Sequence, residues 1–198
     1  MKQEPVDLQE GAEAPVFESP NSEGRLFRLQ DCRGRWVVLY FYPRDHTPGC
    51  TREACEFRDS YAAFQQEEAV VVGVSTDSVE SHARFAARQQ LPFVLVADPD
   101  RAVVRQYGVW GPKRFMGRLL EGTIRSTFLI DPHGRIRRIW RHVRPAGHAA
   151  KVLEELRRLR TGAEPAGPSP TPSQTRQTRN ASAVGTRPSP KPKARKQP

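Results

Sequence analysis

Cysteine is scarce in this sequence, with three residues in a chain of 198. Three cysteines cannot form the paired framework that stabilises small secreted domains. No apolar run approaches the roughly 18 residues of a transmembrane helix, and the first residues lack the apolar core of a secretory signal. We therefore expect a cytoplasmic protein without a membrane partner. In such a protein, a cysteine in a suggestive setting is more often catalytic or metal-binding than structural.

Acidic residues are also rare near the C-terminus. Residues 161–198 contain seven basic side chains, a single acidic one and eight prolines. Such a composition cannot offset the entropy of ordering. We therefore expect one domain at 1–160 and a disordered, proline-rich basic tail at 161–198. The tail favours only weak, salt-sensitive association with nucleic acid, and no base-reading element is evident, so nucleic acid is not an expected partner.

Short apolar runs alternate with helix-like stretches before this boundary. Continuously apolar runs are typical of buried strands, and they occupy residues 36–42, 70–75, 93–98 and 126–131. Helical spacing of apolar residues predicts helices over 51–66, 78–90, 100–107 and 148–160. Residues 135–143 follow a turn and read as the hairpin partner of the preceding strand. This order predicts an α/β, thioredoxin-like fold, with a central mixed sheet flanked by helices and an N-terminal extension.

The segment YFYPRDHTPGCTREACEFRD, residues 40–59, carries the chemistry. A hydrophobic strand ends at Pro43, a polar loop follows, and Pro48 suits the first turn of a helix. Cys50 therefore sits where unpaired backbone N–H groups and the helix dipole favour negative charge. This position favours the thiolate, which is the nucleophilic form of cysteine. Thr47 can turn its hydroxyl toward the sulfur or toward an oxygen bound beside it.

Pro43, Thr47 and Cys50 reproduce the PxxxTxxC motif, and this segment resembles the peroxiredoxins of the bacterioferritin comigratory protein, or peroxiredoxin Q, subfamily. Further segments are similar to that subfamily, and the resemblance covers residues of about 10–160. These similar segments are GAEAPVF (11–17), YGVWGPKRFMG (107–117), RSTFLIDPHGRI (125–136) and PAGHAAKVLEEL (145–156). The resemblance implies a thiol peroxidase that reduces hydrogen peroxide and organic hydroperoxides.

The resemblance also assigns roles to individual residues. Cys50 matches the peroxidatic cysteine, and Thr47 matches the hydroxyl that hydrogen-bonds the peroxide. Pro43 matches the residue that shields the thiolate from water, and Arg125 matches the arginine that stabilises the thiolate and the transition state. Cys55 matches the resolving cysteine found on the same helix in part of the subfamily.

Three other residues keep open interpretations. Glu53 matches the subfamily helix and can orient Arg125, but a solvated first-turn carboxylate explains it equally well. His46 can perturb the thiolate or be a solvated loop histidine, which is the expected case. Cys32 matches no family position and reads as a free, non-catalytic thiol.

The resemblance further implies that oxidised Cys50 forms an intramolecular disulfide with Cys55, which thioredoxin or a similar dithiol reductant reduces. On one intact helix, five residues separate the two Cα atoms by about 7.5 Å along the axis and roughly 140° around it. This exceeds the roughly 7 Å limit for a disulfide, so we expect the first turns to unwind.

Since the resolving thiol lies in the same chain, we expect a monomer. No cofactor and no metal are expected, because the three cysteines lack close histidine partners. The alternative function is a thioredoxin-like thiol–disulfide oxidoreductase, but such enzymes use CxxC at a helix start. Here the second cysteine comes two residues too late.

Overall fold

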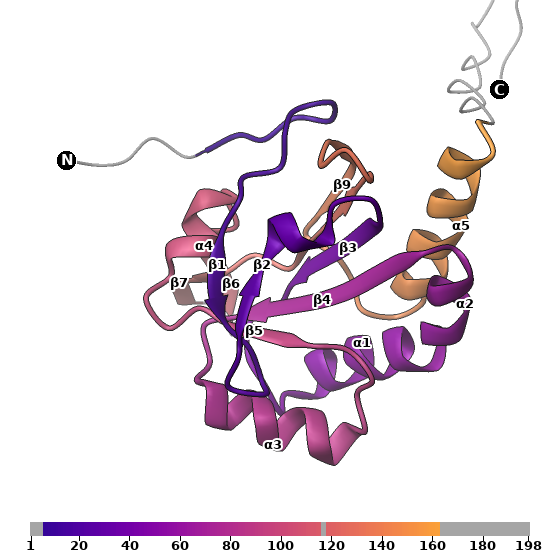
Figure 1. The fold of residues 1–198 in the computed structure, drawn as a ribbon. Helices are drawn as coiled ribbons and strands as arrows, with labels where there is room; N and C mark the ends of the chain where they lie inside the picture. Colours follow the sequence, from indigo (N-terminus) through magenta and orange to yellow (C-terminus); the bar gives the residue numbers. More distant parts are fainter. Residues whose placement is uncertain (1–5, 116–117, 163–198) are drawn as a thin grey trace, which may run out of the picture. The chain divides into compact units, whose positions relative to one another are not determined.

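The computed structural model describes residues 6–115 and 118–162, and a five-stranded mixed sheet forms the centre of this part (Figure 1). The strands lie in the order β5-β4-β3-β8-β9. The first three are parallel to one another, and β8 runs antiparallel to both of its neighbours, β3 and β9. The predicted mixed sheet is confirmed. Its strands are β3 (Trp36–Phe41), β4 (Ala69–Ser75), β5 (Leu95–Ala97), β8 (Ser126–Ile130) and β9 (Ile136–Arg141).

Helices cover both faces of this sheet, as the sequence predicts. Side chains alternate between the two faces along a strand, so Val38 and Tyr40 of β3 pack in one apolar cluster with α1, α2, α3 and α5. Val37 and Leu39 point the other way and pack with α4. Figure 1 shows α4 on the side of the sheet opposite α1. The helices are α1 (Pro48–Asp59), α2 (Tyr61–Gln66), α3 (Val79–Gln89), α4 (Ala102–Gln106) and α5 (His148–Arg160).

The helix expected to run without interruption to residue 66 is two helices, α1 and α2, with a break at Ser60. Ser60 takes φ −96° and ψ 1°, which lies outside the helical region. Its N–H still donates to Glu56, and its carbonyl accepts from Phe64. The change of direction lets both Phe57 and Phe64 enter the same buried cluster. Packing of these two rings therefore overrides the local helical pattern.

Two hairpins and a short 3₁₀ helix were not predicted. They are β1 (Glu18–Pro20) with β2 (Leu26–Arg28), β6 (Trp110–Phe115) with β7 (Arg118–Thr123), and η1 (Leu29–Cys32). The N-terminal segment joins the core, because Ala14 donates to the Gly134 carbonyl at 2.9 Å and Ser22 to the Leu95 carbonyl at 2.7 Å.

The tail expected at 161–198 lies, from residue 163 onward, outside the described residues. Within 6–115 and 118–162, no helix is both long enough and apolar enough to cross a membrane.

Candidate active site

Cys50 lies in the first turn of α1, as the sequence predicts, and is only 2% exposed. Thr47 is the N-cap residue with an extended backbone, and Pro48 is the first helical residue. The first helical hydrogen bond runs from the Thr51 N–H to the Thr47 carbonyl at 2.9 Å. The N–H groups that precede it have no helical carbonyl to bond. The first turn therefore presents polarised N–H groups around a buried sulfur.

Arg125 is the residue just before β8, and its side chain reaches the sulfur of Cys50. Its Nη2 donates to Cys50 Sγ at 3.2 Å, and its Nη1 forms an ion pair with Glu53 Oε2. The arginine side chain is 13% exposed and the glutamate 1%. The solvated-carboxylate interpretation of Glu53 is therefore wrong, since the carboxylate is buried and orients the guanidinium.

Burial shapes the charges of this group. It raises the pKa of the Glu53 carboxyl to about 7, although the Arg125 guanidinium opposes the shift. Burial acts to lower the pKa of Arg125, but the charges and hydrogen bonds of Glu53 and Cys50 have the larger effect. The pKa of Arg125 is therefore raised. The guanidinium is thus a fixed cation next to Cys50. Glu53 Oε1 has no hydrogen-bond partner among the described residues.

The loop that connects β3 to α1 holds Pro43 and Thr47. Pro43 is half-buried and lies two residues after the end of β3. The Thr47 hydroxyl donates to the Arg44 carbonyl at 3.0 Å. Its proton is therefore engaged by the backbone, and the oxygen offers a bound peroxide its lone pairs. The hydroxyl is suited to accept a hydrogen bond rather than to donate one toward the sulfur.

Cys55 is half-buried on the same helix but contacts a different part of the molecule. Its thiol lies 3.6 Å from Gln89 Oε1, at the C-terminal end of α3. Arg58, one turn later, donates to the Gln89 carbonyl at 2.8 Å. All three cysteines are free thiols. Cys50 faces Arg125 while Cys55 faces α3, so the structure does not bring the two thiols together.

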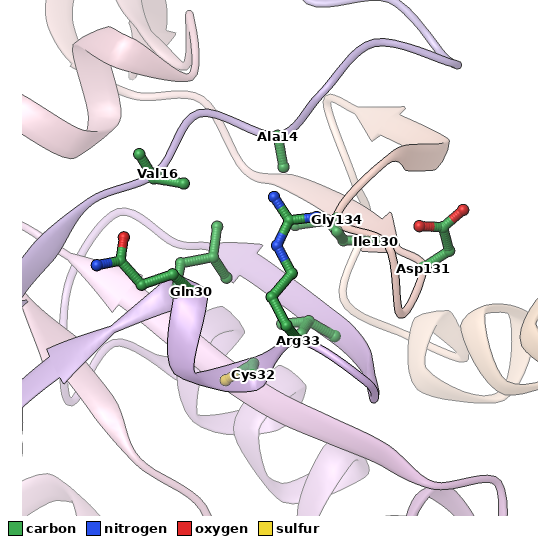
Figure 2. A pocket seen from close by; sticks show the side chains of 10 residues that line it. Ala14, Val16, Gln30, Cys32, Arg33, Ile130, Asp131 and Gly134 are labelled. Atoms are coloured by element: carbon green, nitrogen blue, oxygen red, sulfur yellow. The ribbon is translucent and has the colours of Figure 1, made fainter.

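Cys32 lies at the end of η1 and is 5% exposed. Burial raises the pKa of its thiol, although Arg35 opposes the shift. It packs in the apolar cluster on the α4 side, whereas Cys50 belongs to the cluster on the α1 side. A cavity of about 10 Å³ beside it would hold no more than one water molecule. Figure 2 shows the sulfur turned away from the Arg33 guanidinium.

Two buried histidines escaped the sequence analysis. His82 of α3 is fully buried and hydrogen-bonded to Asp45 in the loop before α1. The sequence does hold a signal for the burial of His82, because His82 and Phe85 lie three residues apart on the apolar face of α3. His148 bonds Thr127 at 2.8 Å, and burial lowers its pKa to about 4. His46, expected to be solvated, is exposed, with φ 58° and its ring edge-on to Phe85.

The chain matches the AhpC/TSA family over residues 11–139. The peroxiredoxin Bcp of Bacillus subtilis is 43% identical over 152 residues, which cover 77% of this chain and 97% of the relative. The peroxiredoxin Bcp of Escherichia coli is 40% identical over 150 residues, which cover 76% of this chain and 96% of the relative. The similarity therefore spans nearly the whole length of these relatives.

Solved structures agree with this similarity. The bacterioferritin comigratory protein of Xanthomonas campestris, whose structures were described for its alkyl peroxide reduction activity, is 41% identical. It superimposes with a TM-score of 0.68 over 71% of this chain and 90% of that chain. A PrxQ mutant of Xylella fastidiosa gives a TM-score of 0.74 at 37% identity, over 80% of this chain and 99% of that chain. The chain therefore belongs to the AhpC/TSA family, as a peroxiredoxin of the bacterioferritin comigratory protein or peroxiredoxin Q type.

Proposed function

We propose that Cys50 is the nucleophile of this thiol peroxidase and that its substrates are hydrogen peroxide and organic hydroperoxides. The Cys50 thiolate attacks the terminal peroxide oxygen, the O–O bond breaks, and the departing oxygen takes a proton to leave as water or an alcohol. Cys50 becomes a sulfenic acid. The observation that carries this assignment is the Arg125 Nη2 at 3.2 Å from a sulfur in the first turn of a helix.

The neighbouring groups supply the remaining roles. Arg125 and the N–H groups of the first turn stabilise the thiolate and the negative charge on the departing oxygen. The Thr47 oxygen accepts a hydrogen bond from the peroxide, and Pro43 keeps water from the thiolate. Alkyl peroxide reduction by the Xanthomonas relative supports organic hydroperoxides as a substrate class.

Cys55 resolves the oxidised state in this proposal. Its thiolate attacks the sulfenic sulfur, a disulfide forms, and hydroxide leaves and is protonated to water. Thioredoxin or a similar dithiol then reduces the disulfide with two electrons and two protons. Since both thiols belong to one chain, the catalytic unit is a monomer. The chain carries no CxxC at the start of α1, so the oxidoreductase alternative is not favoured.

A peroxide-consumption assay with a thioredoxin system tests the assignment. Wild-type protein should consume hydrogen peroxide and an alkyl hydroperoxide, and Cys50→Ser should consume neither, because a serine hydroxyl is not an adequate nucleophile at neutral pH. Circular dichroism of the variant checks that the fold survives. Sustained turnover by the folded Cys50→Ser variant would remove Cys50 from this role.

The wider setting is also part of the proposal. Free cysteines suit the reducing cytoplasm, where thioredoxin is available. The domain at 1–160 performs the chemistry, and the basic tail at 161–198 takes no part in it. A gel shift with full-length protein, with or without salt, tests whether nucleic acid binds. Salt-resistant binding would contradict the exclusion of nucleic acid.

A further inference from the structure

The loop between β3 and α1 is anchored by a buried pair of ionisable side chains, Asp45 and His82. Asp45 is 4% exposed and His82 is fully buried. His82 Nδ1 lies 2.8 Å from Asp45 Oδ2, and His82 Nε2 lies 3.1 Å from the Val96 carbonyl oxygen. The pair joins the loop to α3 and to the β5 strand that carries Val96. None of the roles assigned above uses it.

The partners of the imidazole ring determine its protonation. A backbone carbonyl accepts hydrogen bonds and cannot donate them, so Nε2 carries a proton. Nδ1 faces the Asp45 carboxylate and, at 3.3 Å, the Tyr42 hydroxyl oxygen. That hydroxyl already gives its proton to Asp45 Oδ1 at 2.7 Å. Nδ1 is therefore placed to donate to the Asp45 carboxylate, and the ring bridges the loop and the Val96 carbonyl.

The carboxylate is fully engaged as the anion of this pair. Tyr42 donates to Oδ1, and Ser81 donates to Oδ2 at 2.8 Å. Burial of Asp45 acts to raise its pKa, but the hydrogen bonds and charge of His82 and the two hydroxyl donors outweigh it, and the pKa of Asp45 is lowered. A buried carboxylate with every partner satisfied is expensive to disturb, because removal of a partner leaves its charge uncompensated.

The backbone of Asp45 is held as firmly as its side chain. Its N–H donates to Asp77 Oδ2 at 2.9 Å, and the Ser75 hydroxyl donates to the same oxygen at 2.7 Å. The next residue, His46, takes φ 58°, a left-handed conformation that is uncommon outside glycine. Strained backbone of this kind persists where its surroundings determine it. The anchored Asp45, one residue earlier in the chain, supplies such a constraint.

Asp45 stands midway between Pro43 and Thr47, the two loop residues assigned to the peroxide site. The N-cap Thr47 sets where α1 begins and therefore where the sulfur of Cys50 meets Arg125. A small displacement of this loop would misalign the acceptor oxygen, the helix N–H groups and the guanidinium together. Such misplacement is costly for a reaction that depends on orientation.

We infer that the buried Asp45–His82 pair is a positioning device that holds the peroxide-reacting loop in register with Cys50 and Arg125. This inference rests on the proposed role of Cys50. Neither side chain touches the reacting atoms, and both act through the placement of Thr47 and of the first turn of α1.

Single-turnover oxidation of Cys50 by hydrogen peroxide tests the pair in the full-length protein. His82→Gln and Asp45→Asn should each slow this step by about tenfold or more, because each leaves a misplaced loop. They should also move the pH dependence of Cys50 alkylation to higher pH. The double variant Asp45→Asn with His82→Gln leaves no unpaired buried charge and should recover part of the rate.

His148→Gln is the matched control, because His148 is also a buried histidine but bonds a threonine hydroxyl rather than a carboxylate. It should lower the melting temperature and leave the pH dependence of Cys50 alkylation unchanged. If the His82 variant is less stable but reacts at the wild-type rate, the pair is only structural and the inference fails. If Cys50→Ser keeps its turnover, the proposed function fails instead.

A measurement on wild-type protein covers the case in which the single variants do not fold. Nitrogen-15 NMR of the labelled protein at neutral pH shows which ring nitrogens carry protons. Nδ1 of His82 should carry one, since it donates to Asp45, while the His148 ring should be neutral. A His82 ring without a proton on Nδ1 would overturn the inference. Ser81→Ala, which removes one donor to Asp45, should give a smaller loss of rate and the same direction of pH shift.

Discussion

Cys50 and Cys32 are both almost completely buried, yet they occupy opposite faces of the sheet and different electrostatic surroundings. Cys50 lies at the N-terminus of a twelve-residue helix with a guanidinium against its sulfur. Cys32 ends a short 3₁₀ helix beside apolar side chains, and burial raises its pKa. Burial alone therefore does not make a cysteine reactive. The groups that face the sulfur decide whether its thiolate is stabilised.

The sharpest test of this comparison replaces each cysteine in turn. Cys50→Ser should abolish peroxide turnover, whereas Cys32→Ser should keep the wild-type rate, because Cys32 has no role in the proposed chemistry. Peroxide consumption measures both effects. Thermal melting controls for the new hydroxyl in the apolar cluster. A folded Cys32→Ser variant without activity would mean that both faces of the sheet contribute to the reaction.

The next largest effect concerns recycling. Peroxide should join Cys50 to Cys55, and hydrogen exchange should become faster over residues 48–58, because the disulfide cannot form in the intact helix. Cys55→Ser should keep the first turnover and lose thioredoxin-supported turnover. Mass spectrometry identifies the bond. A Cys50–Cys32 disulfide would break both the resolving assignment and the contrast between the two thiols.

Arg125→Ala should slow peroxide reaction by about a hundredfold or more while the fold remains, because a donor to the developing charge is lost. Stopped-flow oxidation gives the second-order rate constant. Arg125→Lys is a matched variant that keeps the charge but cannot bridge Cys50 and Glu53 with one planar group. An unchanged rate constant in the alanine variant would show that the guanidinium is not what distinguishes Cys50.

The stability of the fold should also depend on pH through His148, which lies on the same face of the sheet as Cys50. The pKa of His148 is lowered to about 4, first by burial and then by Lys151 and Arg125. Its neutral form therefore stabilises the fold fully above the ordinary histidine pKa of about 6.5, and this stabilisation is lost as pH falls through 4.

The loss is of order 3 kcal/mol between these pH values, from a shift of about 2.5 units. Urea unfolding at neutral and acidic pH measures it. His148→Gln should flatten this part of the profile, and exposed His133 is the control position. An equal acid dependence in His148→Gln and in wild-type protein would contradict this assignment.

The smallest expected effect is that of the tail. A chain truncated after Gly162 should retain its rate with hydrogen peroxide, because every residue assigned to the reaction lies between Pro43 and Arg125. Steady-state assays of the truncated and full-length proteins provide the comparison. A large loss of rate would extend the catalytic unit beyond the sheet and its helices.

Local patterns in the sequence predict most strands and helices of the central sheet and its covering layers. The apolar run of β3 and the amphipathic pattern of α5 predict elements that the structure confirms. Pro48 marks the first turn of α1 and thereby the setting of Cys50. These predictions succeed because a strand repeats every two residues and a helix every 3.6, so a short window holds the signal.

Other features depend on neighbours that are distant in the chain. The end of α1 at Ser60 follows from the packing of Phe57 and Phe64 in one cluster. The β6–β7 hairpin contains glycine and proline, which weaken a strand signal, and it exists through pairing of its two strands. Neither feature has a periodic signature that a single segment reveals.

Sequence patterns alone predict the strands of the central sheet, the helices α3, α4 and α5, and the placement of Cys50 at a helix start. Which groups face that cysteine depends instead on contacts between segments that are distant in the chain. The antiparallel register of β8 against β3 brings Arg125 to Cys50 and Glu53 from more than 70 residues away. The packing of α3 likewise places His82 against Asp45. Both contacts depend on strand register and helix packing, which join segments that no local period relates.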